Sequence, residues 1–226
     1  MWQKILERQF LHLLALAILL VPVVLLSQHP SIQAGQFFFT SWTLFWAAII
    51  IAIIHQIYVW FIWRIELHGD AISRRWPNYG FSGYKLGFSV IGTGRLVFLT
   101  WLAFANRGSL EIPETLRFFL TITLVLITSY AFYSVIRYFG SDRAAGIDHF
   151  ETKEWSMVTE GIFKYTSNGM YLYAFLIVWV PGIWFSSSAA ILAAAFQHAY
   201  IWVHYYCTEL PDIQHIYGES PSSSRS

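Results

Sequence analysis

The stretch VPGIWFSSSAAIL, Val180 to Leu192, joins two apolar runs of the chain through only three serines. One run extends from about Met170 to Phe185, and the other from about Ala189 to Tyr206. A linker as short as Ser186 to Ser188 forces two such helices into a tight antiparallel hairpin. The Pro181-Gly182 pair breaks the first of these helices near its end. We therefore expect the beginning of the first run and the end of the second run to lie side by side.

The composition is that of an integral membrane protein. Of the 226 residues, 56% are hydrophobic and 12% are charged, whereas a typical soluble domain carries about 25% charged residues. Aromatic residues make up 19%, which suits membrane interfaces and pockets for flat or apolar groups. The absence of a basic stripe argues against a nucleic-acid partner. The single cysteine, Cys207, excludes a disulfide framework.

Four more apolar runs precede the hairpin, and each approaches the roughly 20 residues that a transmembrane helix needs. They cover about Phe10–Leu26, Trp42–Trp63, Leu86–Ala105 and Phe118–Phe139. The first resembles a signal peptide, but no convincing cleavage site follows it, so we interpret it as a retained helix. The sequence therefore predicts an all-α integral membrane protein with about six transmembrane helices, the last two forming the hairpin.

Lysine and arginine are concentrated in the N-terminal tail and in the second and fourth loops, which predicts that both termini are cytoplasmic. In a bacterium this membrane would be the cell inner membrane. The predicted organisation is four transmembrane helices in residues 1–140 and a disordered tail in residues 219–226. Residues 141–218 between them hold a cytoplasmic loop, the hairpin and a C-terminal motif.

Polar residues inside the apolar runs mark functional sites more often than polar residues in soluble cores do. Arg95 either pairs with a carboxylate or reaches a water-filled cavity, or its span starts later and the side chain extends to the interface. His55 and His198 lie in different helices and would suit haem ligation, although a lone buried histidine is more often structural.

The hairpin brings the polar stretch GIFKYTSNGMY, Gly161 to Tyr171, close to the end of the last helix. On that helix His198, Trp202, Tyr205 and Glu209 are spaced to share one face. Aromatic residues alone would be normal for a helix that leaves the membrane. Glu209, however, precedes a proline that would end the helix, where the helix dipole disfavours an anion, so we expect a cationic partner for it. A carboxylate, amides, hydroxyls and tyrosine rings suit a cationic ligand with a flat ring, such as S-adenosylmethionine.

Two motifs here resemble the membrane methyltransferases, a family that includes isoprenylcysteine carboxyl methyltransferases and phospholipid N-methyltransferases. Gly161 to Tyr171 is similar to the family's Gly-x-Tyr/Phe-Arg-Tyr-x-Arg-His/Asn-Pro-x-Tyr motif, and MVTEG, Met157 to Gly161, to its Leu-Val-Thr-x-Gly lead-in. TELPDIQHIYG, Thr208 to Gly218, is similar to the Arg-x-x-x-Glu-Glu-x-x-Leu-x-x-x-Phe-Gly ending, with Glu209 as the first glutamate. The chain departs from the family pattern in having Ser167, Gly169, Tyr205 and Leu210 in place of arginine, proline, arginine and the second glutamate.

The resemblance implies S-adenosylmethionine-dependent methyl transfer to a lipid or lipid-borne nucleophile at the cytoplasmic face. Asn168 is the form seen among phospholipid methyltransferases, and the tyrosine at 205 argues against a carboxylate substrate, so we expect a phospholipid-type amine. We assign Glu209 to the cofactor's ammonium group and His204 to proton acceptance, as the two catalytic residues. The expected cofactor-binding residues are Gly161, Lys164, Tyr165, Ser167, Asn168, Met170, Tyr171, Glu209 and Tyr217, and no metal is expected.

Two other interpretations stay open. Membrane sterol reductases share a similar C-terminal architecture and use NADPH, but they would need a basic pocket for the 2′-phosphate, and Lys164 is the only basic residue in this stretch. A non-catalytic membrane protein, diverged from the family or binding haem, is the second. The sequence does not determine the oligomeric state.

Overall fold

The computed structural model describes residues 1–151, 156 and 158–218, and this part of the chain is helical apart from one short ribbon. The ribbon pairs β1 (Gln36–Phe37) with β2 (Phe39–Thr40) in antiparallel fashion. The predicted tail 219–226 and Met157 of the lead-in motif lie outside the described residues.

Within the described residues, four helical segments are long and apolar enough to cross a membrane, and they coincide with the first four predicted spans. Their main helices are α2 (Gln9–Ser27), α4 (Ser41–Leu67), α6 (Gly80–Ala105) and α7 (Glu114–Ser134). The helix α1 (Trp2–Ile5) precedes α2, and a π-helical turn η1 (Val135–Phe139) extends α7. Short helical elements occupy the connections: α3 (Pro30–Gln33), α5 (Ala71–Arg75), α8 (Ser141–Ala144), η2 (Ile147–His149) and η3 (Gly161–Lys164).

The fifth predicted span is a broken helix. It consists of α9 (Gly169–Leu172), the 3-10 helix η4 (Ala174–Val178) and α10 (Trp179–Trp184). The expected break at Pro181-Gly182 was wrong, because both residues lie within α10 and the α-helix is interrupted at η4 instead. At 16 residues, this apolar segment is shorter than the four long ones, so the count of six spans stays a prediction.

The sixth predicted span is α11 (Ser188–His204), and it does not end where the sequence suggested. A π-helical turn, η5 (Tyr205–Glu209), leads directly into α12 (Leu210–Tyr217). Pro211 lies in the first turn of α12, directly after the π-helical turn, and the helix continues through it. The expectation that Glu209 sits at a proline-terminated helix end was therefore wrong. The dipole of a helix C-terminus is thus not the reason to expect a cationic partner for Glu209.

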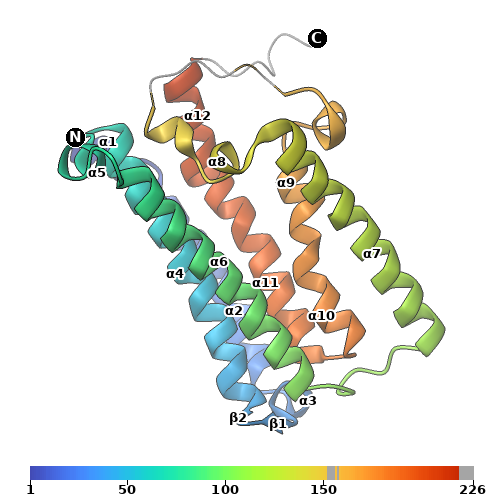
Figure 1. Ribbon diagram of the computed structural model, residues 1–226. Coiled ribbons are helices and arrows are strands. Elements are labelled where there is room, and N and C mark those ends of the chain that lie inside the picture. Colours follow the sequence, from blue (N-terminus) through green and yellow to red (C-terminus); the bar gives the residue numbers. More distant parts are fainter. Residues whose placement is uncertain (152–155, 157, 219–226) are drawn as a thin grey trace.

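The expected hairpin between α10 and α11 is present (Figure 1). The backbone N–H of Ser187 donates to the carbonyl of Gly182 at 2.8 Å, and the Ser187 hydroxyl caps α11 by accepting from the Ala190 N–H at 3.1 Å. A Cβ on Gly182 would lie 3.0 Å from the backbone nitrogen of Ile191, so the close approach of the two helices requires a glycine there.

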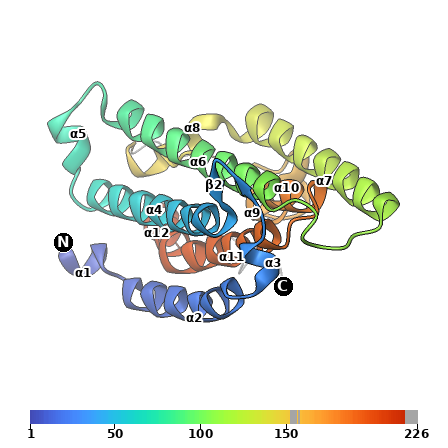
Figure 2. The ribbon, with the colours of Figure 1, turned by 90° about the horizontal axis from the view of Figure 1, so that it is seen from below.

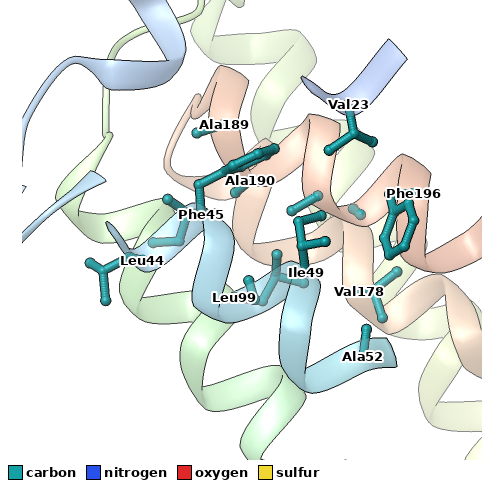
Figure 3. Packing of buried hydrophobic residues seen from close by; sticks show 14 of the residues in the cluster. Val23, Leu44, Phe45, Ile49, Ala52, Leu99, Val178, Ala189, Ala190 and Phe196 are labelled. Carbon is teal, nitrogen blue, oxygen red and sulfur yellow. The ribbon is translucent and has the colours of Figure 1, made fainter. Parts of the chain in front are cut away.

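The main apolar core fills the half of the bundle nearest the hairpin turn. Ala189, Ala190, Ala193 and Ala194 are completely buried on α11, and these small side chains let α4 come close. Phe45 and Ile49 of α4 fill the space that the alanines leave (Figure 3).

Opposite ends of the bundle differ in what they carry (Figure 1). One end, called here the hairpin end, holds the Ser186–Ser188 turn, α3 and the ribbon. The other, called here the α12 end, holds α1, α5, α8 and α12. Arg8 donates to the carbonyl of Tyr206 at 3.1 Å, so the N-terminal segment and the end of the last long helix meet there. This agrees with the prediction that both termini lie on the same side of the membrane. Their cytoplasmic placement stays a prediction.

Candidate functional site

The two motif segments meet at the α12 end through Tyr171 and Glu209. Tyr171 lies in α9, Glu209 is the last residue of η5, and the tyrosine hydroxyl donates a hydrogen bond to the glutamate carboxylate. The tyrosine ring also packs edge-on against Trp202 and Tyr205, with centroids 5.9 and 5.8 Å apart. The predicted proximity of the two ends of the hairpin is thus confirmed.

Asn168 joins the same group of side chains. It is half-buried just before α9, and its side chain is within hydrogen-bonding reach of Tyr205. An amide, a carboxylate and three aromatic rings therefore surround one region at the α12 end.

The Glu209 carboxylate is ionised with difficulty. It lies three residues beyond the predicted end of the sixth span, and burial raises its pKa from 4.5 to about 7. The hydrogen bond from Tyr171 and the nearby His149 act in the opposite direction, while Asp212 and Asp148 raise the pKa further. A cation bound beside Glu209 would relieve this cost, which fits the expected cationic ligand.

The beginning of the GIFKYTSNGMY stretch serves packing. Gly161 has a φ of +59°, and a Cβ there would lie 2.6 Å from the Ser134 hydroxyl, so this glycine allows η3 to lie against α7. Ile162 and Phe163 are buried, and Phe163 stacks on Phe139 with a centroid separation of 5.0 Å.

The remaining predicted cofactor residues vary in position. Lys164, Tyr165 and Ser167 are exposed, and no described contact joins them to Glu209. Met170 packs in a small apolar cluster with Ile162. The roles of these four residues in cofactor binding stay predictions.

Sequence reasoning missed a buried ionic cluster beneath the site. Asp212 of α12 forms an ion pair with Arg64 of α4, whose Nε lies 2.5 Å from the carboxylate, and its other oxygen lies 3.3 Å from the His149 Nε2. Neither Arg64 nor Asp212 is exposed by more than 2%. One signal was available, because Asp212 follows Glu209 by three residues and would lie on a neighbouring part of the same helix.

The loop residues 146–149 complete the cluster. The His149 ring stacks on Trp63 at 4.1 Å, and a Cβ on Gly146 would come within 2.4 Å of the same indole. Tyr217, a predicted cofactor residue, donates to Asp148 at 2.5 Å, and burial raises the pKa of its hydroxyl. Through these contacts the loop and α12 are fixed to α4.

His204, the predicted proton acceptor, lies deeper than Glu209. Its side chain is buried next to Trp63 and His12, and its Nδ1 has no hydrogen-bond partner. No described contact links it to Glu209, so its catalytic role stays a prediction.

The two histidines considered for haem have separate hydrogen-bond partners. His55 Nδ1 lies 3.0 Å from the Arg95 guanidinium, and His198 Nδ1 accepts from Trp179 at 3.0 Å. Within the described residues, no group of three or more His, Cys, Asp or Glu side chains is placed to hold a metal ion.

Comparison with known families agrees with this geometry. Residues 116–220 match the family model described as phospholipid methyltransferase. The resemblance to the membrane methyltransferases is confirmed. The matched segment begins in α7 and includes the hairpin, η5 and α12, and so contains every predicted site residue. No curated protein and no solved structure matches the chain.

Proposed function

We propose that the protein transfers a methyl group from S-adenosylmethionine to the amine of a phospholipid at the α12 end of the bundle. The main support for the proposal is the hydrogen bond from Tyr171 to Glu209, which joins two motif segments 38 residues apart in the chain. Both segments lie within the stretch that matches the phospholipid methyltransferases.

The side chains around Glu209 fit the cofactor. S-adenosylmethionine supplies the methyl group on a sulfonium, which is already a strong electrophile and needs mainly to be aligned with its acceptor. The Glu209 carboxylate would bind the cofactor's ammonium group, and the rings of Tyr171, Trp202 and Tyr205 offer faces to a cation or to the adenine. Asn168 would hydrogen-bond the polar groups of the cofactor.

Glu209 and His204 would have different roles in the reaction, charge pairing with the cofactor and proton acceptance respectively. A positive charge bound at Glu209 favours its carboxylate form, because opposite charges lower the pKa of a carboxyl group. The acceptor amine must lose its proton before or during the displacement, and we assign that proton to His204, directly or through water.

Calorimetry on the purified full chain tests the cofactor assignment. We expect S-adenosylmethionine to bind and NADPH not to bind. Glu209→Ala should weaken S-adenosylmethionine binding by tenfold or more, since hydrogen bonds to charged groups contribute roughly 1.5–3 kcal/mol. Glu151→Ala, which removes an exposed carboxylate, is the matched control and should bind as the wild type does. Equal affinity in the Glu209→Ala variant would remove the assignment, and binding of NADPH alone would favour a reductase.

A methyl-transfer assay tests the acceptor. With S-adenosylmethionine labelled on its methyl group, we expect label in phosphatidylethanolamine vesicles but not in phosphatidylglycerol vesicles, which have no amine. His204→Gln should keep cofactor binding and lose turnover, whereas turnover at the wild-type rate would exclude His204 as the proton acceptor.

A further inference from the structure

Arg95 is a buried cation in the middle of the bundle, distant from the proposed methyl-transfer site. It lies 15 residues after the start of α6 and 10 before its end, which places it roughly midway along the helix. Its side chain is only 4% exposed, so it does not extend to the interface as one interpretation of the sequence suggested. Its neighbours come from α4, α11 and η4, and α4 and α11 pack against α6 (Figure 2).

The apolar stretches around Arg95 contain no opposite charge. Asp, Glu, Lys and Arg are absent from residues 9–27, 41–63, 118–136 and 169–208, and Arg95 is the one such residue in 86–105. In the described structure no carboxylate contacts the guanidinium. The structure therefore shows no support, among the described residues, for the interpretation that Arg95 pairs with a carboxylate.

The contacts that Arg95 does make leave part of its charge unsatisfied. Its Nε donates to the Gln197 amide oxygen at 3.2 Å, its Nη1 lies 3.0 Å from His55 Nδ1, and its guanidinium lies 5.1 Å from the centre of the Phe175 ring. Within the described residues, the Arg95 Nη2 is buried without a hydrogen-bond partner. A charged side chain that is more than nine-tenths buried thus has an unpartnered N–H group.

An arginine stays protonated in proteins, and a charge at bilayer depth costs several kcal/mol or more unless it is compensated. Neutral amide and imidazole groups compensate it only in part. An oxyanion would supply both the missing charge and the acceptors for the free N–H groups.

We propose that Arg95, with His55 and Gln197, binds the oxyanionic head group, carboxylate or phosphate, of an amphiphile that enters from the bilayer. The bilayer is the source because the surrounding helices are apolar, and an amphiphile carries its charge on an apolar chain. Gln197 precedes Glu209 by 12 residues, roughly 18 Å at the helical rise, so this site is distinct from the cofactor region. The proposal does not depend on methyl transfer.

Thermal unfolding of the full chain in a non-ionic detergent tests this site. The probes are oleate, which has a carboxylate, lysophosphatidic acid, which has a phosphate, and monoolein, which is neutral. We expect a saturable rise in Tm with one or both anionic probes and none with monoolein, and the active probe identifies the head group. Arg95→Gln should lose the rise. Arg107→Gln removes an exposed arginine at the hairpin end and should keep it.

A second variant keeps the proposal falsifiable if Arg95→Gln does not fold. Gln197→Glu places a carboxylate of the same shape against the guanidinium and would occupy the site from within the chain. It should abolish the response to the anionic probes, although it loses the hydrogen bond that the Gln197 amide donates to the Ala48 carbonyl at 3.2 Å. The proposal is overturned if neither anionic probe acts on the wild type, if monoolein acts equally well, or if Gln197→Glu responds as the wild type does.

Discussion

The two ends of this bundle are stabilised in different ways. Near the hairpin end, fully buried alanines of α11 pack against Phe45 and Ile49, and apolar contact holds the helices together. Near the α12 end, the buried ion pair between Arg64 and Asp212 and the contact of Asp212 with His149 hold α4, η2 and α12 together. Apolar packing tolerates many sequences of similar volume, whereas a buried ion needs a particular partner. The candidate site lies at the α12 end, where each buried ion needs a particular partner.

Removing one member of the ionic cluster should have the largest effect on stability. Asp212→Ala leaves Arg64 buried and without its carboxylate, and we expect a loss of about 3–5 kcal/mol in the free energy of unfolding. Chemical or thermal unfolding of the purified protein measures it.

An exposed ion pair at the same end is the matched control. Arg74 and Asp70 lie 3.6 Å apart with side chains more than 70% exposed, and Arg74→Ala should cost less than about 1 kcal/mol. Similar losses in the two variants would mean that burial does not distinguish the α12 end.

Replacing Glu209 by glutamine should change stability and cofactor binding in opposite directions. Its pKa is raised from 4.5 to about 7, so the folded protein holds that proton more tightly than the unfolded chain does. The stability of the wild type therefore falls as pH rises from about 4.5 to 7, by at most on the order of 3 kcal/mol. Glu209→Gln avoids this loss. It should be more stable than the wild type at pH 8, equally stable below about pH 4.5, and weaker in binding S-adenosylmethionine.

The comparison of unfolding curves at pH 8 and pH 4.5 checks this directly. A Glu209→Gln variant that is less stable than the wild type at pH 8 would show that the carboxylate has a fixed cationic partner within the chain.

Much of the fold could be predicted because its signals are local. Runs of apolar residues and the three-serine linker are visible without knowing the fold, and they predicted four spans and the hairpin. The hairpin also predicted that Tyr171 and Glu209 belong to one region. The continuation of α11 into α12 was missed, because a π-helical turn before Pro211 has no clear sequence pattern.

The buried cluster could not be predicted because its members are distant in sequence. Arg64 follows the apolar run that ends at Trp63, His149 lies in a polar loop and Asp212 lies within the second motif. Each therefore has the sequence context of an ordinary surface residue. Only the packing of α4 against the last helix and η2 makes them neighbours. The same is true of Arg95, whose environment depends on His55 and Gln197 from two other helices.

A substitution at the hairpin end should have a smaller effect than loss of the ionic cluster and none on the site. Ala193 is completely buried in α11, and Ala193→Leu adds volume where α4 packs closely. Overpacking of this kind costs about 1–3 kcal/mol, because side chains and backbone must shift to admit the added atoms. Since Ala193 lies four turns before Glu209 along the helix, the affinity for S-adenosylmethionine measured by calorimetry should not change. A variant that loses affinity as well as stability would show that the two ends are coupled through α11, and that the apolar packing also sets the position of Glu209.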